Sequence, residues 1–458
     1  MSAIKKLSII LVILPIFLLA NTVKETNITV YNSNLGLVQE ILSVKIDKGN
    51  DIFKIAGISS QVDPTTVHLE FPKEQSKIRV LEQNYLYDLV NSTKIFEKYI
   101  GEKITCYTNS GNAFTAELLS IEGSNLIVRK EDGGIRIINR KEIFDYNFPK
   151  LPGGLILKPT LQWQLQSQYA GQTDAKLSYL TGGMSWHAEY VLILDEKDEN
   201  GSLSSWVSLE NNSGAAFEQA KLKLIAGEIN RARQERAYPP QAAKAYGMAM
   251  ADMAAEENFQ ERGLMDYHLY ELQRPVDLKD KEIKQVSMFD NLSCTVEKQY
   301  IFSNHNYASL EKPLKVRVKI PNTQQNNLGI PLPKGIVRIF KEDVDKTLQL
   351  VGEDNINHTS KNDTLKLTVG NAFDVKGKRI IVNRDKYQRS EEVTVRIKIT
   401  NNKDEKVSVL VEELHPNDWN VLETSDKYVK KSNSQLHFYI DVAANASRTI
   451  EYKFRRNW

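Results

Sequence analysis

The stretch VTVRIKIT, residues 393–400, decides the fold class, because apolar and polar side chains alternate along its whole length. The same period of two recurs in LKVRVKI (314–320), TLKLTVG (364–370), KVSVLVEEL (406–414), LHFYIDV (436–442) and TIEYKF (449–454). Such alternation is typical of antiparallel strands with one buried face and one polar face. Turn-forming clusters such as NNKDE and KNDT separate the runs. The sequence therefore predicts a mainly β protein with tandem β-sandwich domains.

A second compact block precedes these strands. Residues 100–148 contain five short strand-like runs, separated by the hairpin signals NSGN, EGSN and EDGG. This spacing predicts a small SH3-like or Sm-like barrel inserted into the chain. The expected division is a signal peptide at 1–20, an N-terminal β domain at 21–95, the small barrel at 96–150, a β-sandwich at 151–310 and a C-terminal β-sandwich at 311–458.

One segment lacks the strand pattern. Residues 231–263 are rich in Ala, Gln, Glu and Arg, and they contain Met248, Met250 and Met253. We expect a low-order or helical Met/Ala-rich insertion between two strands, since Ala and Met favour helix. A thioether metal site or a hydrophobic partner surface is the alternative for this segment.

The N-terminus predicts export. MSAIKK supplies a positive region, LSIILVILPIFLLA an apolar region, and Ala20 a small residue for cleavage. The apolar run is shorter than a bilayer span of roughly 20 residues, and Pro15 disfavours a permanent helix. We therefore expect no stable membrane span after cleavage, and a periplasmic, cell-envelope or extracellular location. The formal net charge of +2 gives no reason to expect nucleic acid as a partner.

Metal and redox chemistry have no local signature in the sequence. Cys106 and Cys294 are the only cysteines; they either form one disulfide or act as small buried hydrophobes. None of the seven histidines lies three or four residues from another, and no Cys-x-x-Cys is present. We expect no cofactor and no metal.

The stretch YLTGGMSWHAEYVLILD, Tyr179–Asp195, resembles a catalytic loop at first sight. In an extended segment, Ser185 and His187 lie on one face, but the glycine that follows the serine in a G-x-S-x-G elbow is missing. A glycine turn that leads into a buried strand explains the stretch better. Asp354 lies in an acidic segment suited to glycoside cleavage or Ca²⁺ binding, although solvated hairpin tips carry such residues as well. Ser185, His187 and Asp354 are the candidate site residues.

Several motifs follow one another in a fixed order: LTGGMSWHAEYVLIL, SWVSLENNSGAAFEQAKLKLIAGEIN, NNLGIPLPKGIVRIFKED and LVGEDNINHTSKNDTLKLTVGNAFDV, with EYKFR near the end. This order resembles the family of domain of unknown function 4139, which includes mucoidy-inhibitor-like proteins, over roughly residues 150–458. Those relatives carry a coiled coil before the domain, whereas this chain has the small barrel there. The resemblance implies no catalytic residues. Its motif residues are expected to form turns and core anchors: Gly182, Trp186, Tyr190, Asn212, Gly214, Gly227, Pro331, Gly335 and Gly352.

These observations favour an exported, non-enzymatic binding or envelope-assembly protein whose partner is an envelope protein or a polysaccharide. The small barrel and the Met-rich segment are the expected contact surfaces, because loops on a rigid β scaffold often carry recognition. An envelope hydrolase acting on glycan or peptide, with Ser185 and His187 or the acidic hairpin involved, is the alternative.

Overall fold

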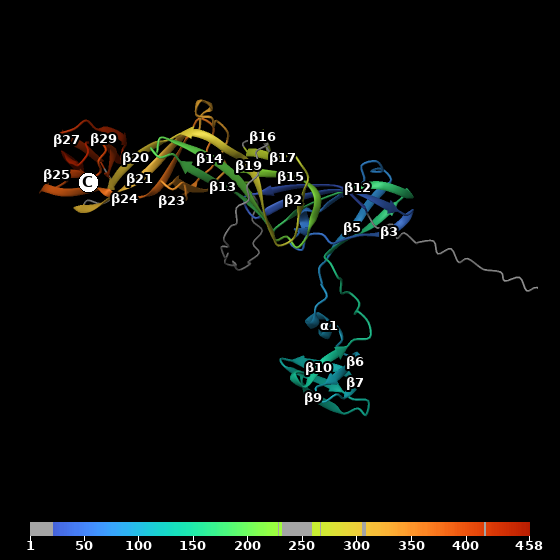
Figure 1. Ribbon diagram of the computed structural model, residues 1–458. Helices are drawn as coiled ribbons and strands as arrows, with labels where there is room; N and C mark the ends of the chain where they lie inside the picture. The colour runs from blue at the N-terminus through green and yellow to red at the C-terminus, as the bar shows by residue number, and fades with distance from the viewer. Residues whose placement is uncertain (1–21, 228, 231–258, 266, 305–307, 416–417) are drawn as a thin grey trace, which may run out of the picture.

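The structure is a computed structural model that describes residues 22–227, 229–230, 259–265, 267–304, 308–415 and 418–458. Strands dominate these residues, which confirms the mainly β prediction. Figure 1 shows the larger sheets in an elongated row, with the small barrel set apart on a linker. The expected signal peptide at residues 1–20 lies outside the described residues and stays a prediction.

The eight-stranded sheet and the three-stranded sheet share one hydrophobic core, in which Phe53 stacks on Trp163 at 5.7 Å between ring centroids. This core contains residues that precede the barrel in the sequence and residues that follow it. The regions expected as separate domains at 21–95 and 151–310 therefore pack together. The parallel pairing of β1 with β15 has the same effect. The eight-stranded sheet has the order β16-β17-β15-β1-β2-β12-β4, with β18 paired to β15. Its strands are β1 (Thr22–Tyr31), β2 (Leu35–Ile46), β4 (His68–Glu70), β12 (Gly171–Thr181), β15 (Phe217–Ala226), β16 (Phe259–Leu264), β17 (Tyr267–Leu272) and β18 (Val276–Leu278); the three-stranded sheet is β3 (Gly49–Ala56), β11 (Thr160–Ser167) and β5 (Ile78–Leu86), and η1 is Pro64–Thr66.

Between β5 and β11, where the hairpin signals predicted the small barrel, the chain forms a five-stranded sheet, and this module is called the small barrel below. Its five strands have the order β10-β6-β7-β8-β9 and enclose a separate core. Two linker segments join it to the body; Val90 N donates to Ile156 O at 3.0 Å between them. The elements are α1 (Ser92–Lys98), β6 (Lys103–Thr108), β7 (Ala113–Glu122), β8 (Asn125–Arg129), β9 (Ile135–Asn139), η2 (Arg140–Glu142) and β10 (Ile143–Asn147).

The middle and C-terminal sheets are interleaved along the chain. The middle sheet has the order β19-β14-β13-β22-β23, and β22 pairs in parallel with β13. Residues 335–356, expected in the C-terminal sandwich, therefore lie in the middle sheet. The strands are β13 (Met184–Leu194), β14 (Asn200–Asn211), β19 (Glu282–Thr295), β22 (Gly335–Glu342) and β23 (Leu348–Ile356), and η3 is Gln324–Asn326.

The C-terminal sheet has nine strands in the order β27-β30-β25-β24-β21-β20-β26-β29-β28. β21 and β24 each contribute side chains to two hydrophobic cores. One part of each strand packs under the middle sheet, and the other part packs within the C-terminal domain. No sheet boundary therefore falls at residues 310–311. The strands are β20 (Glu297–Asn304), β21 (Leu310–Pro321), β24 (Thr364–Lys386), β25 (Ser390–Asn401), β26 (Val407–Leu414), β27 (Asp418–Thr424), β28 (Val429–Ser432), β29 (Gln435–Val442) and β30 (Ala446–Asn457).

The Met-rich segment is described only at its end. Residues 259–263, expected to be low-order or helical, belong instead to strand β16, which pairs with β17 as an edge hairpin. Pairing with a neighbouring strand overrides the weak local preference of FQERG. Residues 231–258 lie outside the described residues. Where the structure is described, no helix is both long and apolar enough to cross a membrane.

Candidate functional site

Strand β13 places Ser185, His187 and Glu189 on its outer face, because successive side chains of a strand alternate. Trp186 and Tyr190 point the other way and are buried. His187 is exposed, and its Nε2 lies 3.2 Å from Glu189 Oε1. The same-face prediction for Ser185 and His187 is therefore confirmed. The ring nitrogen of His187, however, faces Glu189 and not the Ser185 hydroxyl.

Glu189 is the centre of this outer-face cluster. Arg338 from β22 lies 3.4 Å from Glu189 Oε2, and Gln285 from β19 donates to the same oxygen at 3.2 Å. The hydrogen bond with His187, followed by the charge of Arg338, lowers the pKa of the Glu189 carboxyl. A general acid needs a raised pKa, so a carboxylate held ionised in this way suits a structural cross-strand network.

The side chain of Asp354 on β23 also accepts hydrogen bonds from the backbone. Its Oδ2 accepts from the Thr368 amide at 2.6 Å, and its Oδ1 accepts from the Asn355 amide at 2.9 Å. The first bond joins β23 to β24 beside an irregular part of the β21–β24 ladder. The side chain therefore satisfies backbone donors at the place where the middle and C-terminal sheets meet.

The glycine-rich motif residues meet at a loop junction, which comprises residues 59–63, 180–184 and 211–215. Gly182 N donates to Gln61 O at 3.0 Å, and Asn212 N donates to Gly183 O at 2.6 Å. Gly214 has a φ of +83°, and a Cβ added there would lie 2.0 Å from Ser60 Oγ. Only glycine fits this position, since it combines left-handed backbone with a close approach. The loop junction fixes the first core against the middle sheet.

The remaining motif residues anchor neighbouring elements. Tyr190 donates its hydroxyl to Pro333 O at 2.7 Å, and Trp186 Nε1 donates to Ile225 O at 3.3 Å. Pro331 O accepts the Tyr270 hydroxyl at 3.0 Å. An added Cβ would lie within 2.4 Å of a neighbouring atom at each of Gly227, Gly335 and Gly352. The structure thus places the motif residues in turns, close approaches and core contacts.

A second polar cluster lies inside the C-terminal sheet and was missed by the sequence reasoning. Arg379 Nε donates to Glu413 Oε2 at 2.8 Å, and the Tyr452 hydroxyl donates to the same oxygen at 2.7 Å. His415 Nε2 lies 3.2 Å from that hydroxyl. Burial, reinforced by the charges of Arg379 and Arg456, lowers the pKa of His415 to about 3, so the imidazole is neutral near pH 7. All four named members of the cluster (Arg379, Glu413, His415, Tyr452) are buried, which suits an internal network rather than a substrate site.

Residues 175–458 of the chain match a family model that is described as Domain of unknown function (DUF4139). The chain belongs to the DUF4139 family. The matched residues begin within β12 and include the middle and C-terminal sheets, as well as the Arg379–Glu413 cluster. The small barrel lies before the DUF4139 match. A search of the curated proteins finds no match.

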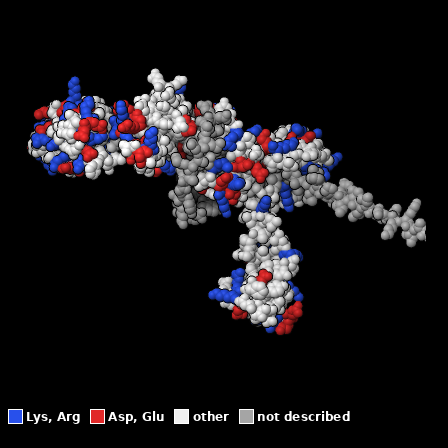
Figure 2. All heavy atoms as spheres, viewed as in Figure 1, with Lys and Arg blue, Asp and Glu red and all other residues white. Residues whose placement is uncertain are grey.

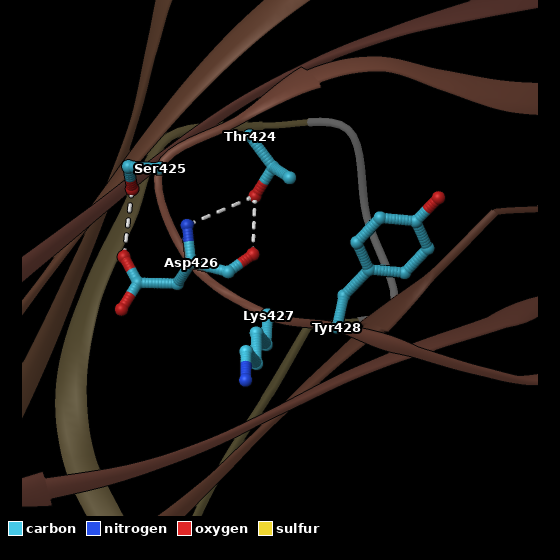
Figure 3. A pocket seen from close by; sticks show the side chains of 5 residues that line it. All are labelled: Thr424, Ser425, Asp426, Lys427 and Tyr428. Carbon is cyan, nitrogen blue, oxygen red and sulfur yellow. Dashed lines mark hydrogen bonds between the residues drawn. The ribbon is translucent and has the colours of Figure 1, made fainter.

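A hollow in this DUF4139 domain lies at the loop between β27 and β28, lined by Thr424 to Tyr428 (Figure 3). Its polar groups are used by the turn itself: Thr424 Oγ1 donates to Asp426 O at 2.9 Å, and Ser425 Oγ donates to Asp426 Oδ2 at 2.7 Å. Arg448 Nη2 pairs with Asp426 Oδ1 at 2.6 Å. Because the lining residues are consecutive, the hollow does not bring together groups from several elements, as an active site would.

The cysteines are free and lie in different cores. Cys106 is buried in the barrel and Cys294 under the middle sheet of the DUF4139 domain, and burial raises the pKa of both thiols to about 11. The small-hydrophobe alternative therefore describes both residues. Among the described residues, no group of three or more His, Cys, Asp or Glu is arranged to hold a metal ion.

The small barrel, outside the DUF4139 match, exposes apolar side chains on its two edge strands. Ile135 and Ile137 on β9 are 67% and 66% exposed, and Phe144 on β10 is 66% exposed. The barrel face seen in Figure 2 is largely uncharged towards its centre. The hairpin signals predicted these strands, but they did not predict that β9 and β10 lie at the edges of the sheet, because that depends on the strand order.

Proposed function

We propose that the chain is an exported, non-enzymatic binding or assembly protein of the cell envelope and that the small barrel is its contact surface. The partner is an envelope protein or a polysaccharide. The observation that carries the proposal is the exposed apolar set Ile135, Ile137 and Phe144 on open strands of a barrel that stands apart from the body. Exposed apolar groups on a module that stands apart from the body are available for contact with a partner.

The other polar clusters support a binding role over catalysis. On the outer face of β13, His187 and Arg338 both contact Glu189, whose pKa is lowered. In the C-terminal sheet, Arg379 and Glu413 are buried and bonded to each other. In both arrangements the polar side chains bond to one another. This favours a structural role, in which the sheets form a scaffold for the barrel, over catalysis.

Site-specific photocrosslinking in the native cells tests the proposal. A photoreactive residue replaces Ile137 on the barrel or, as a matched control, Ile283 on β19, which is also 66% exposed. We expect a defined crosslinked envelope component from position 137 and not from position 283. Equal capture at both positions, capture at neither, or retention of the chain in the cytoplasm with its leader would overturn the proposal.

An envelope hydrolase remains the second candidate, because Ser185, His187 and Glu189 lie in a row on one face of β13. In that case Ser185→Ala abolishes turnover of envelope glycan or peptide fragments, while Ser202→Ala, a change on the neighbouring strand, does not. Equal activity in the two variants would exclude a nucleophilic role for Ser185.

A further inference from the structure

Three polar side chains lie on the inner faces of three neighbouring strands of the C-terminal sheet. β20 lies between β21 and β26 in the strand order. Lys312 on β21 is two residues from the core residue Leu314 and therefore shares its inward face. Asn304 on β20 and Glu413 on β26 are register partners in the parallel pair, and both are buried. The sheet thus brings an amine, a carboxamide and a carboxylate together from three separate strands.

The contacts among these side chains place the carboxamide between the amine and the carboxylate. The side-chain amide of Asn304 donates a hydrogen bond to Glu413. Lys312 Nζ donates to the carbonyl oxygen of Ser303, the residue directly before Asn304. The same Nζ lies 5.7 Å from the centroid of the Phe302 ring, and the charge of Glu413 acts on it. Lys312 Nζ is therefore held beside the Asn304 position at one end of the buried core.

The surroundings favour the reactive forms of the amine and the carboxyl group. Burial, followed by the charge of Lys315, lowers the pKa of the Lys312 amine, which increases the neutral, nucleophilic fraction. Burial raises the pKa of the Glu413 carboxyl, which suits a group that takes up a proton and returns it. The Tyr452 hydroxyl donates to Glu413 Oε2 at 2.7 Å and holds this carboxylate in place.

We propose that Lys312 and Asn304 form an intramolecular isopeptide bond. The lone pair of the neutral Lys312 Nζ attacks Asn304 Cγ and forms the new C–N bond. Glu413 takes one proton from Nζ and delivers it to Asn304 Nδ2, the nitrogen that already donates to this carboxylate. The bond between Cγ and Nδ2 then breaks, and ammonia leaves. The reaction needs no oxidant, reductant or further reagent, and the folded sheet supplies the proximity of the two groups.

The bond joins β20 to β21 beyond the end of their backbone ladder. Among the described residues, the last register pair of this ladder is Ile301 with Lys315. Asn304 and Lys312 each lie three residues beyond that pair. A covalent link there closes the two strands where their backbone pairing stops, and it restricts the unfolded chain as other crosslinks do. The inference goes beyond the binding role of the barrel and does not depend on it.

The intact mass of the purified full chain tests the bond. We expect wild type to weigh about 17 Da less than the mass calculated for its sequence, because one ammonia is lost. Lys312→Arg keeps the positive charge but removes the nucleophilic amine, so it should have the full mass. Lys315→Arg, the matched control on the same strand, should keep the loss. A wild type of full mass, or the same loss in Lys312→Arg, overturns the proposal.

Proteolysis after glutamate locates the bond. Cleavage after Glu311 separates the peptide that contains Asn304 from the peptide that contains Lys312. We expect these two peptides to remain joined in wild type and to separate in Lys312→Arg. Fragmentation of the joined species should place the link at positions 304 and 312. Two separate wild-type peptides, or a loss of ammonia confined to one of them, overturns the proposal.

The proton transfer is tested at Glu413. Glu413→Gln keeps the size of the side chain but cannot take up the proton, so folded molecules of this variant should lose ammonia at least about 100-fold more slowly than wild type. Glu412→Gln, a change on the opposite face of β26, should react as wild type. Circular dichroism of each variant checks that the sheets have formed. Equal rates in folded Glu413→Gln and wild type overturn the role of Glu413 in the reaction.

Discussion

The C-terminal sandwich and the small barrel differ in where they place charged side chains. The sandwich buries an ion pair, with Arg379 and Glu413 each 1% exposed, and Figure 2 shows a surface densely covered by charged residues. The barrel instead leaves Ile135, Ile137 and Phe144 exposed on its edges. Buried charges with bonded partners fix internal packing, whereas exposed apolar groups on open strands favour contact with another molecule. Under the proposed function, the sandwich is part of the scaffold and the barrel is the contact surface.

The largest effect is expected when the buried pair is broken. Arg379→Ala leaves Glu413 without its cation in a low-dielectric core and should lower the free energy of unfolding by about 3–5 kcal/mol. Urea denaturation at pH 7 measures it. Arg396→Ala removes an exposed pair with Glu451 in the same sheet and should cost less than about 1 kcal/mol.

A double variant separates the loss of the pair from the cost of an unpaired charge. Arg379→Met with Glu413→Leu removes both charges and should recover much of the stability lost in Arg379→Ala. Equal destabilisation in Arg379→Ala and Arg396→Ala would contradict the role given to the buried pair.

Glu40 on β2 sharpens the comparison, because it is a half-buried carboxyl beside the first core that, among the described residues, has no ion pair such as that of Glu413. Burial raises the pKa of Glu40 from 4.5 to about 7. The folded state therefore carries no penalty below about pH 4.5, and it loses stability as the pH rises through 7. Glu40→Gln should stabilise the chain at pH 8 by up to about 3 kcal/mol and have little effect at pH 4. Denaturation of both proteins at both pH values measures the difference; a pH-independent difference would contradict the raised pKa.

Gly183 tests the loop junction, with a smaller expected loss. Its φ is +78°, and an added Cβ would lie 2.6 Å from Asn212 O. Gly183→Ala should therefore cost about 1–3 kcal/mol in thermal unfolding. Gly370→Ala is the matched control, because an added Cβ there meets nothing within 4 Å. The same melting temperature for both variants would refute the close approach at Gly183.

The smallest effect on stability is expected at the barrel edge. Ile137→Asp should change the unfolding free energy by no more than about 0.5 kcal/mol, because the side chain is already in water. Ile138→Asp, one residue along β9, buries a carboxylate at a position that is 2% exposed and should unfold the barrel. Similar losses in the two variants would show that β9 does not present alternate residues to core and solvent.

The sequence reasoning predicted faces better than partners. Alternation along β13 placed Ser185 and His187 on one side, which the structure confirms, but Glu189 and Arg338 were missed. Glu189 follows His187 by two residues, so the alternation of side chains along a strand was enough to predict that Glu189 lies on the same face. Glu413 also continues an inward series after Val409 and Val411, and a charged residue at such a position signals a buried partner. The identity of that partner, Arg379, comes from another strand and has no local signal.

The sequence by itself determined the strand content, the inserted barrel and the DUF4139 membership, because period two, turn chemistry and motif order are properties of neighbouring residues. Only the tertiary structure decided that β1 pairs with β15, that β22 returns to β13, and that β9 and β10 remain open edges. Period two gives the buried face of a strand but carries no information on its neighbour. The neighbour is selected by the packing of the whole core, and the surface left for a partner is decided with it.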